Sequence, residues 1–290
     1  SRPRYEKLKL VQLAGPEMTG YYNNWGTSKN KERVVGYIDW LLRAIPEKEI
    51  YLTMPKKVLF RCLQEYLGIS GHDDNTYPIS VSKHGKAIKI SHHARSIGSN
   101  EFKDCDAVIY LWDNYLPQST SIQRFHTLEN EAITDEALED ANSGQLIGDY
   151  KRIKEAQFID NMMQQIGRGR VRVIDESAVV GRMTAYVLTD RADRFVKLSA
   201  QYRGCHLDQL GYEDNAVKKP IGQLAQVIMF LRDYEKEEDI LVPTVEEALG
   251  FKLRRHSAIL TDNWDVLQTG YQYVPGGRGR GKSATFKWNG

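Results

Sequence analysis

The segment QQIGRGRVRV, from Gln164 to Val173, places three arginines beside two glycines. Arginine suits phosphoryl transfer, in which negative charge builds on the phosphoryl oxygens, because its planar guanidinium stays charged and binds two oxygens at once. Gly167 allows the backbone to turn so that neighbouring arginines point into one cleft. Residues of these types are therefore suited to contact a phosphate group. The alternative is a basic loop that contacts nucleic acid or solvent.

A second glycine- and arginine-rich segment, VPGGRGRGKSATFKW, begins at Val274. Gly276, Gly281, Lys282 and Ser283 fit the pattern G-x-x-x-x-G-K-[ST], which binds phosphates only between a buried strand and the N-terminus of a helix. Only seven residues, ATFKWNG, follow the pattern, and Thr, Phe and Trp prefer strands. The helical context of a phosphate-binding loop is therefore not expected here.

The same segment fits the tip of a β-hairpin, where glycine allows the turn. Arg278, Arg280 and Lys282 would then reach the phosphates of a nucleic acid. A merely solvated loop is the alternative.

Composition sets wider bounds on the protein. The 290 residues have a net charge of +2, which is too mild to indicate a nucleic-acid partner without local clusters. Cys62, Cys105 and Cys205 are widely spaced, which predicts buried free thiols rather than a disulfide framework or a zinc site. No apolar run approaches the ~20 residues of a membrane span, and the N-terminus lacks the apolar core of a signal peptide. We expect a soluble, cytoplasmic protein.

The first two-thirds of the chain alternates helical and strand patterns. Helices are expected at 30–45, at 56–68 and, with a break near Gly144, over 134–165. Short apolar strands are expected at 49–55, 86–91, 106–112, 170–175 and 184–189. This alternation predicts an α/β domain over residues 1–215, with a mostly parallel sheet and helices on both faces.

The last third, residues 216–290, has a different pattern. Helices are expected at 220–234, at 244–250 and from Leu253 to Leu267, followed by strands at 271–274 and 284–288. Helix, turn, helix and then a hairpin is the order of a winged helix. Arg254 and Arg255 would begin its recognition helix, where base and phosphate contacts concentrate. Alternatively they are the solvated start of a helix.

The arginine segment resembles motif VI of superfamily-two helicases, Q-x-x-G-R followed by further arginines. Gln164, Gly167 and Arg168 occupy the family positions. The commonest form has its second arginine where this chain has Val171, whereas Arg170 matches the R-x-R variant of Dicer-like and RNA-sensor helicases. The second arginine is therefore either Arg170 or Arg172. The resemblance implies a second RecA-like domain whose arginines reach the γ-phosphate of ATP.

Two further segments resemble the same family in the right order. Gly98, Ser99 and Asn100 match motif V, which contacts the nucleic-acid backbone and couples it to ATP. Thr53 and Lys56, on either side of a proline, match the motif IV strand and turn, which would face the bound strand. The resemblance covers about Asn30 to Thr189. It implies that ATP with Mg²⁺ is bound mainly by a first RecA-like domain, for which this chain shows neither a credible phosphate loop nor an acidic box.

His92 and His93 are adjacent and should point to opposite sides of a strand. No metal-ligand spacing surrounds them, so no metal site is expected. They either line the nucleic-acid track or have a structural role.

The resemblance, together with the winged-helix pattern, implies the C-terminal half of an ATP-dependent DNA or RNA helicase, suited to replication and inactive in hydrolysis by itself. Its expected partners are a single strand on the RecA-like domain, a duplex on the winged helix, and an N-terminal RecA-like domain or partner chain, with no membrane. The alternative is a non-enzymatic winged-helix DNA-binding module for replication or regulation. It would bind duplex in a salt-dependent way and without nucleotide.

Overall fold

The computed structural model describes residues 4–16, 28–72, 76–93, 100–113, 118–129, 148–174, 178–189, 192–212, 223–234, 236–253, 257, 260, 269–276 and 283–289. Its largest element is a seven-stranded sheet in the order β3-β4-β2-β5-β6-β1-β7. The strands are β1 (Leu8–Leu13), β2 (Glu49–Met54), β3 (Ile79–Lys83), β4 (Lys86–His92), β5 (Ala107–Leu111), β6 (Met183–Leu188) and β7 (His206–Leu210).

Six of these strands run parallel, and only the edge strand β3 is antiparallel to its neighbour β4. The carboxyl ends of the six parallel strands therefore lie at one edge of the sheet, and their amino ends lie at the opposite edge. This arrangement confirms the predicted mostly parallel α/β sheet.

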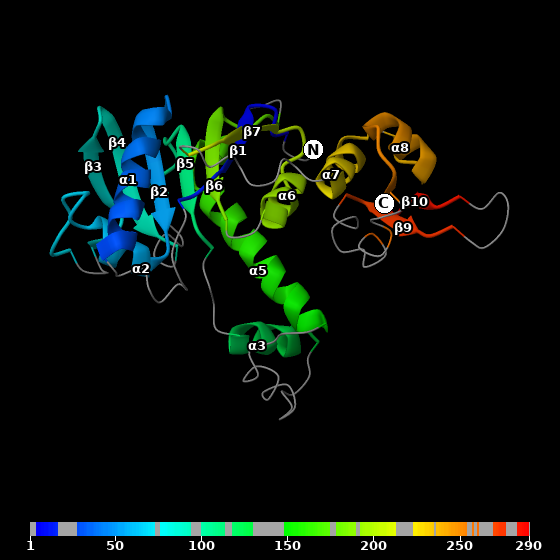
Figure 1. Ribbon diagram of the computed structural model, residues 1–290, viewed down its shortest axis with the longest axis horizontal. Helices are drawn as coiled ribbons and strands as arrows, with labels where there is room; N and C mark the ends of the chain where they lie inside the picture. The colour runs from blue at the N-terminus through cyan, green and yellow to red at the C-terminus, as the bar shows by residue number, and fades with distance from the viewer. Residues whose placement is uncertain are drawn as a thin grey trace.

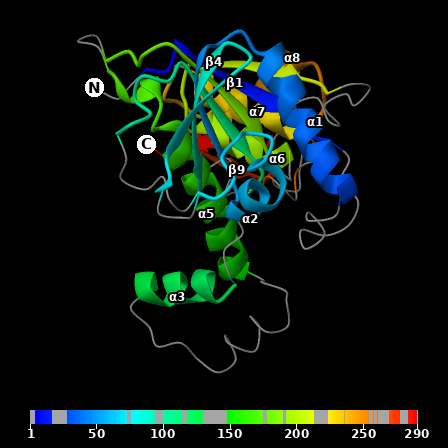
Figure 2. The same ribbon diagram turned by 90° about the vertical axis from the view of Figure 1, so that its left-hand side faces the viewer.

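Helices cover both faces of the sheet (Figures 1 and 2). On one face, α1 (Ser28–Ala44) and the helical segment α2 (Lys56–Val58) with its π-helical continuation (Leu59–Leu63) bury a core with Ile50, Leu52 and Met54 of β2. On the other face, α5 (Gly148–Ile166) and α6 (Ala192–Ala200) bury Tyr51 of the same strand. Alternate residues of β2 thus enter opposite cores, as the period of a strand requires.

The helix α3 (Gln118–Glu129) packs against α5, and the pair projects beyond the sheet (Figures 1 and 2). The helices at 30–45 and 56–68 and the strands at 49–55, 86–91, 106–112 and 184–189 are confirmed within a few residues. The end of the helix predicted over 134–165 is confirmed as α5, whereas its beginning lies outside the described residues. The sequence patterns did not indicate α3, α6, β1, β3 and β7.

The strand predicted at 170–175 is wrong. Arg170–Arg172 forms a single 3₁₀ turn, in which the amide of Arg172 donates to the carbonyl of Gly169 at 3.1 Å. The amide of Arg170 donates instead to the carbonyl of Cys105 at 3.1 Å. The backbone amides of Arg170 and Arg172 are therefore hydrogen-bonded outside any strand ladder. The alternating apolar pattern of this segment does not determine its structure.

The C-terminal part contains α7 (Gln223–Asp233), α8 (Val242–Leu249) and an antiparallel sheet in the order β8-β10-β9. The strands are β8 (Ile240–Leu241), β9 (Tyr271–Val274) and β10 (Thr285–Trp288). These elements enclose a core of their own, to which Val227, Val245, Tyr271 and Phe286 belong. Gly250 ends α8 in the left-handed conformation, with φ 74°.

The predicted hairpin strands are confirmed as β9 and β10. Because β10 follows Ser283 so closely, no helix occupies the place that a phosphate-binding loop requires. The hairpin tip and most of the predicted recognition helix lie outside the described residues, as does the expected boundary at residues 215 and 216. None of the described helices is long and apolar enough to cross a membrane.

The three cysteines are buried free thiols, as predicted. Burial raises the pKa of Cys105 to about 12 and that of Cys205 to about 11.

Candidate functional site

The arginine turn, residues 167–172, begins where α5 ends. The amide of Gly167 donates to the carbonyl of Met163 at 2.8 Å, and that of Gly169 donates to Ile166 at 3.2 Å. A Cβ atom on Gly169 would lie 2.4 Å from the Met183 sulfur. It would also lie 2.8 Å from a methyl carbon of Val108, so any larger residue would force these packed side chains to shift. This close approach holds the turn against the amino ends of β5 and β6.

The three arginines of the turn differ in exposure and in contacts. Arg168 is only 8% exposed, and burial lowers its pKa. Arg170 is half-buried, and its Nη2 donates to the carbonyl oxygen of Asp104 at 2.8 Å. Arg172 is exposed, and its Nη1 donates to Oδ1 of Asn100 at 2.8 Å. Of the three arginines expected to reach ATP, Arg172 is therefore the most accessible in this conformation and Arg168 the least.

The contact between Arg172 and Asn100 joins two segments that the sequence reading singled out separately. The residues are 72 positions apart in the chain, so sequence reading alone could not place them together. Gln164 is exposed on α5, where its side-chain amide donates to Asp160 at 3.0 Å. Gly98, Ser99, Arg254, Arg255, Arg278, Arg280 and Lys282 lie outside the described residues.

At the carboxyl edge of the sheet, Thr53 is fully buried, and its hydroxyl lies 3.0 Å from Nδ1 of His93. The expectation that Thr53 faces a bound strand is not met in this conformation, because the adjacent strands and His93 enclose it. Lys56 is exposed, with Nζ 5.6 Å from the centre of the Phe60 ring. Of Thr53 and Lys56, the two residues expected to face a bound strand, Lys56 is therefore the accessible one.

The contacts of His93 define its protonation. Nε2 lies 2.9 Å from the carbonyl oxygen of Trp112, which can only accept, so Nε2 carries the proton. Nδ1 then accepts from the Thr53 hydroxyl. Burial lowers the pKa of His93 to about 4, so the ring is neutral at physiological pH.

The two adjacent histidines point to opposite faces of the sheet, as predicted. His93 stacks on Tyr110, with ring centres 4.5 Å apart, whereas His92 lies near Phe60 and Tyr77 on the other face. Both side chains are buried. Burial favours a structural role for them over direct contact with a bound strand.

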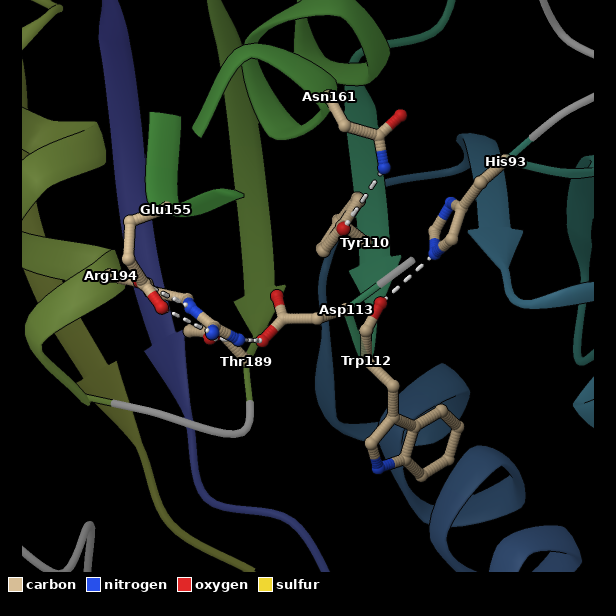
Figure 3. A network of polar contacts seen from close by, with 8 residues as sticks. All are labelled: His93, Tyr110, Trp112, Asp113, Glu155, Asn161, Thr189 and Arg194. Carbon is tan, nitrogen blue, oxygen red and sulfur yellow. Dashed lines mark hydrogen bonds and ion pairs between the residues drawn. The ribbon is translucent and has the colours of Figure 1, made fainter. Parts of the chain in front are cut away.

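A buried charged cluster that the sequence reading missed lies at the end of β5 (Figure 3). Arg194 of α6 forms an ion pair with Asp113 and donates two hydrogen bonds to Glu155 of α5, at 2.9 and 3.0 Å. The Thr189 hydroxyl donates to Asp113 at 3.0 Å. The guanidinium carbon also lies 3.7 Å from the centre of the Phe158 ring. The cluster fastens both helices to the sheet.

Trp112, the residue before Asp113, has a left-handed backbone with φ 57°, which is unusual for a bulky side chain. Its ring joins the core beneath α1, while Asp113 points to the opposite face (Figure 3). No sequence pattern indicated this turn.

Comparisons of the chain with protein-family models, with curated proteins and with solved structures find no match. Within the described ranges, no group of three or more His, Cys, Asp or Glu side chains could hold a metal ion.

Proposed function

We propose that this chain is the second RecA-like domain of a superfamily-two, ATP-dependent helicase, followed by a winged helix. The observation that carries the proposal is the contact of Arg172 with Asn100 at the amino edge of the sheet, because it joins the segments that resemble motifs VI and V. In this proposal ATP and Mg²⁺ are bound mainly by a first RecA-like domain, in the same polypeptide or on a partner chain.

The arginine turn supplies the positive charge that phosphoryl transfer requires. Arg172 is accessible to a phosphate in the present conformation. Arg168 is mostly buried, so in this proposal its guanidinium reaches the γ-phosphate only after the turn rearranges on domain closure. The lowered pKa of Arg168 marks a charge that burial destabilises and that an anionic phosphate would stabilise.

The proposed function includes two nucleic-acid-binding sites. A single strand contacts Lys56 and the segment from Gly98 to Asn100. A duplex contacts the C-terminal part through Arg254, Arg255, Arg278, Arg280 and Lys282. The second candidate function, a non-enzymatic binding module, is favoured by the three-stranded sheet with its β9–β10 hairpin, and it needs only the duplex site.

Charge reversal distinguishes the two functions. Binding of fluorescein-labelled single strands and of a hairpin duplex is measured by anisotropy for wild type and for Lys56→Glu. The same measurement is made for a triple variant that combines Arg278→Glu, Arg280→Glu and Lys282→Glu. The helicase half loses single-strand affinity in Lys56→Glu and keeps it in the triple variant. A binding module loses duplex affinity in the triple variant and is unaffected by Lys56→Glu.

Hydrolysis tests the arginine turn. With the first RecA-like domain present, Arg168→Ala should abolish ATP hydrolysis and leave strand binding nearly unchanged, because the guanidinium stabilises only the transition state. Retained turnover in this variant contradicts the proposed function. Turnover by the chain alone that is lost in Lys282→Ala would instead identify a working phosphate loop at Gly276–Ser283.

A further inference from the structure

Two adjacent glutamines at the end of α5 have opposite environments. Gln164, which matches the helicase pattern, is exposed, whereas Gln165 is 1% exposed. The side-chain oxygen of Gln165 accepts from the Tyr51 hydroxyl at 2.6 Å. Its side-chain amide donates to the carbonyl oxygen of His93 at 3.1 Å. Gln165 therefore connects β2, the end of β4 and the helix that leads into the arginine turn.

His93 is held from several sides at the other end of this connection. Its ring is bonded to Thr53 and Trp112 and stacked on Tyr110. The Tyr110 hydroxyl accepts a long hydrogen bond of 3.4 Å from Asn161, one turn before Gln165 on α5 (Figure 3). His93 consequently cannot shift without disturbing the carboxyl ends of β2 and β5.

We propose that Gln165 is a positioning residue that ties the arginine turn to the carboxyl edge of the sheet through His93, so that binding of a single strand stabilises the turn. The inference rests on the proposed function, because it requires a strand that contacts Lys56 and Asn100. Breaking either buried hydrogen bond leaves a polar group without its partner, which costs more than the bond itself contributes. The turn and the edge therefore shift together.

The turn offers a readout that is independent of hydrolysis. Its amides are hydrogen-bonded: Gly167 to Met163, Arg168 to Gln165, Gly169 to Ile166 and Arg170 to Cys105. Hydrogen exchange at these positions requires local opening, so its rate reports the stability of the turn. Coupling must be measured in this way rather than inferred from the path of contacts.

The experiment measures amide exchange of residues 167–173 in the full chain, free and saturated with oligothymidylate or oligouridylate. Gln165→Met removes both hydrogen bonds while keeping side-chain size, and Tyr51→Phe removes one. Gln165→Asn keeps a side-chain amide on a shorter side chain. This variant replaces Gln165→Met in the experiment if the methionine variant does not fold. Gln164→Leu is the matched control, because it changes the adjacent glutamine outside the buried network.

In wild type and in Gln164→Leu, the bound strand should slow exchange in the turn by at least about fivefold, the lower end of measured couplings between sites. In Gln165→Met the slowing should be lost, and in Tyr51→Phe, which keeps the hydrogen bond to His93, it should be reduced. Strand affinity measured by anisotropy should remain in both variants. Equal slowing in wild type and Gln165→Met, or no slowing in a wild type that binds the strand, overturns the role of Gln165. Failure of wild type to bind either strand overturns the proposed function as well, and the two failures are thus distinguishable.

Discussion

At the scale of single residues, the buried histidine at the carboxyl edge should contribute to the response of the protein to acid. His93 is enclosed by Thr53, Trp112 and Tyr110 and remains neutral because burial opposes its protonation. In the unfolded chain the same imidazole titrates near its ordinary pKa of about 6.5. The unfolded state therefore binds more protons between these two pKa values.

This difference predicts the sign of the pH dependence. Because the folded-state pKa of about 4 lies below the unfolded value, the stabilising contribution of neutral His93 is fully present above about pH 6.5 and is lost as the pH falls toward 4. The loss should reach about 3 kcal/mol in the free energy of unfolding. Urea titrations at several pH values measure it. His93→Gln should flatten this part of the profile, and an unchanged slope in that variant would contradict the assignment.

Gly169 permits a prediction about the arginine turn. Gly169→Ala should destabilise the protein by about 1–3 kcal/mol, because the new methyl group overlaps Met183 and Val108 in a packed interior. Urea unfolding of Gly169→Ala, Met183→Ala and the double variant gives a double-mutant cycle. Removing the Met183 side chain should relieve part of the cost of the alanine. Strict additivity of the two changes would argue against the overlap.

At the scale of elements, the cluster of Asp113, Arg194 and Glu155 joins β5, α5 and α6. Arg194→Met should destabilise the protein by about 3–5 kcal/mol, because Asp113 is fully buried and would lose its cationic partner. Chemical denaturation measures the change. Arg43→Ala, which breaks an exposed pair with Asp39, is the control and should have little effect. Equal effects of the two substitutions would mean that the buried cluster does not fasten the helices.

At the scale of the whole molecule, the sheet domain and the C-terminal part meet where α7 packs on α6. Arg232 of α7 is buried and donates to the carbonyl oxygen of Ser199 at 2.5 Å, in the last turn of α6. The carbonyls of a helical C-terminus lack partners within the helix and carry partial negative charge, so a guanidinium suits this position.

Arg232→Met should loosen this junction, because the described residues form separate hydrophobic cores on its two sides. The expected result is two resolved transitions in calorimetry and a larger radius of gyration by X-ray scattering. Arg203→Met, at an exposed arginine, is the control. A single unchanged transition in Arg232→Met would show that other contacts hold the two parts together.

The sequence by itself predicted the features that depend on neighbouring residues. Apolar periodicity indicated α1, β2, β5 and β6, and Gly250 marked the end of α8. The β9–β10 hairpin followed from strand preference on both sides of a glycine-rich turn. These features follow from backbone preferences and side-chain spacing over a few residues, which the sequence displays directly.

Only the tertiary structure decided which distant residues meet. It placed β1 between β6 and β7, buried Thr53 and His93, and brought Arg172 to Asn100. It also turned the expected strand at 170–175 into a 3₁₀ turn, because Cys105 accepts the amide of Arg170. Gln165 was missed beside Gln164 for the same reason. Burial and long-range hydrogen bonding are properties of the packed sheet and helices, and no local pattern in the chain contains them.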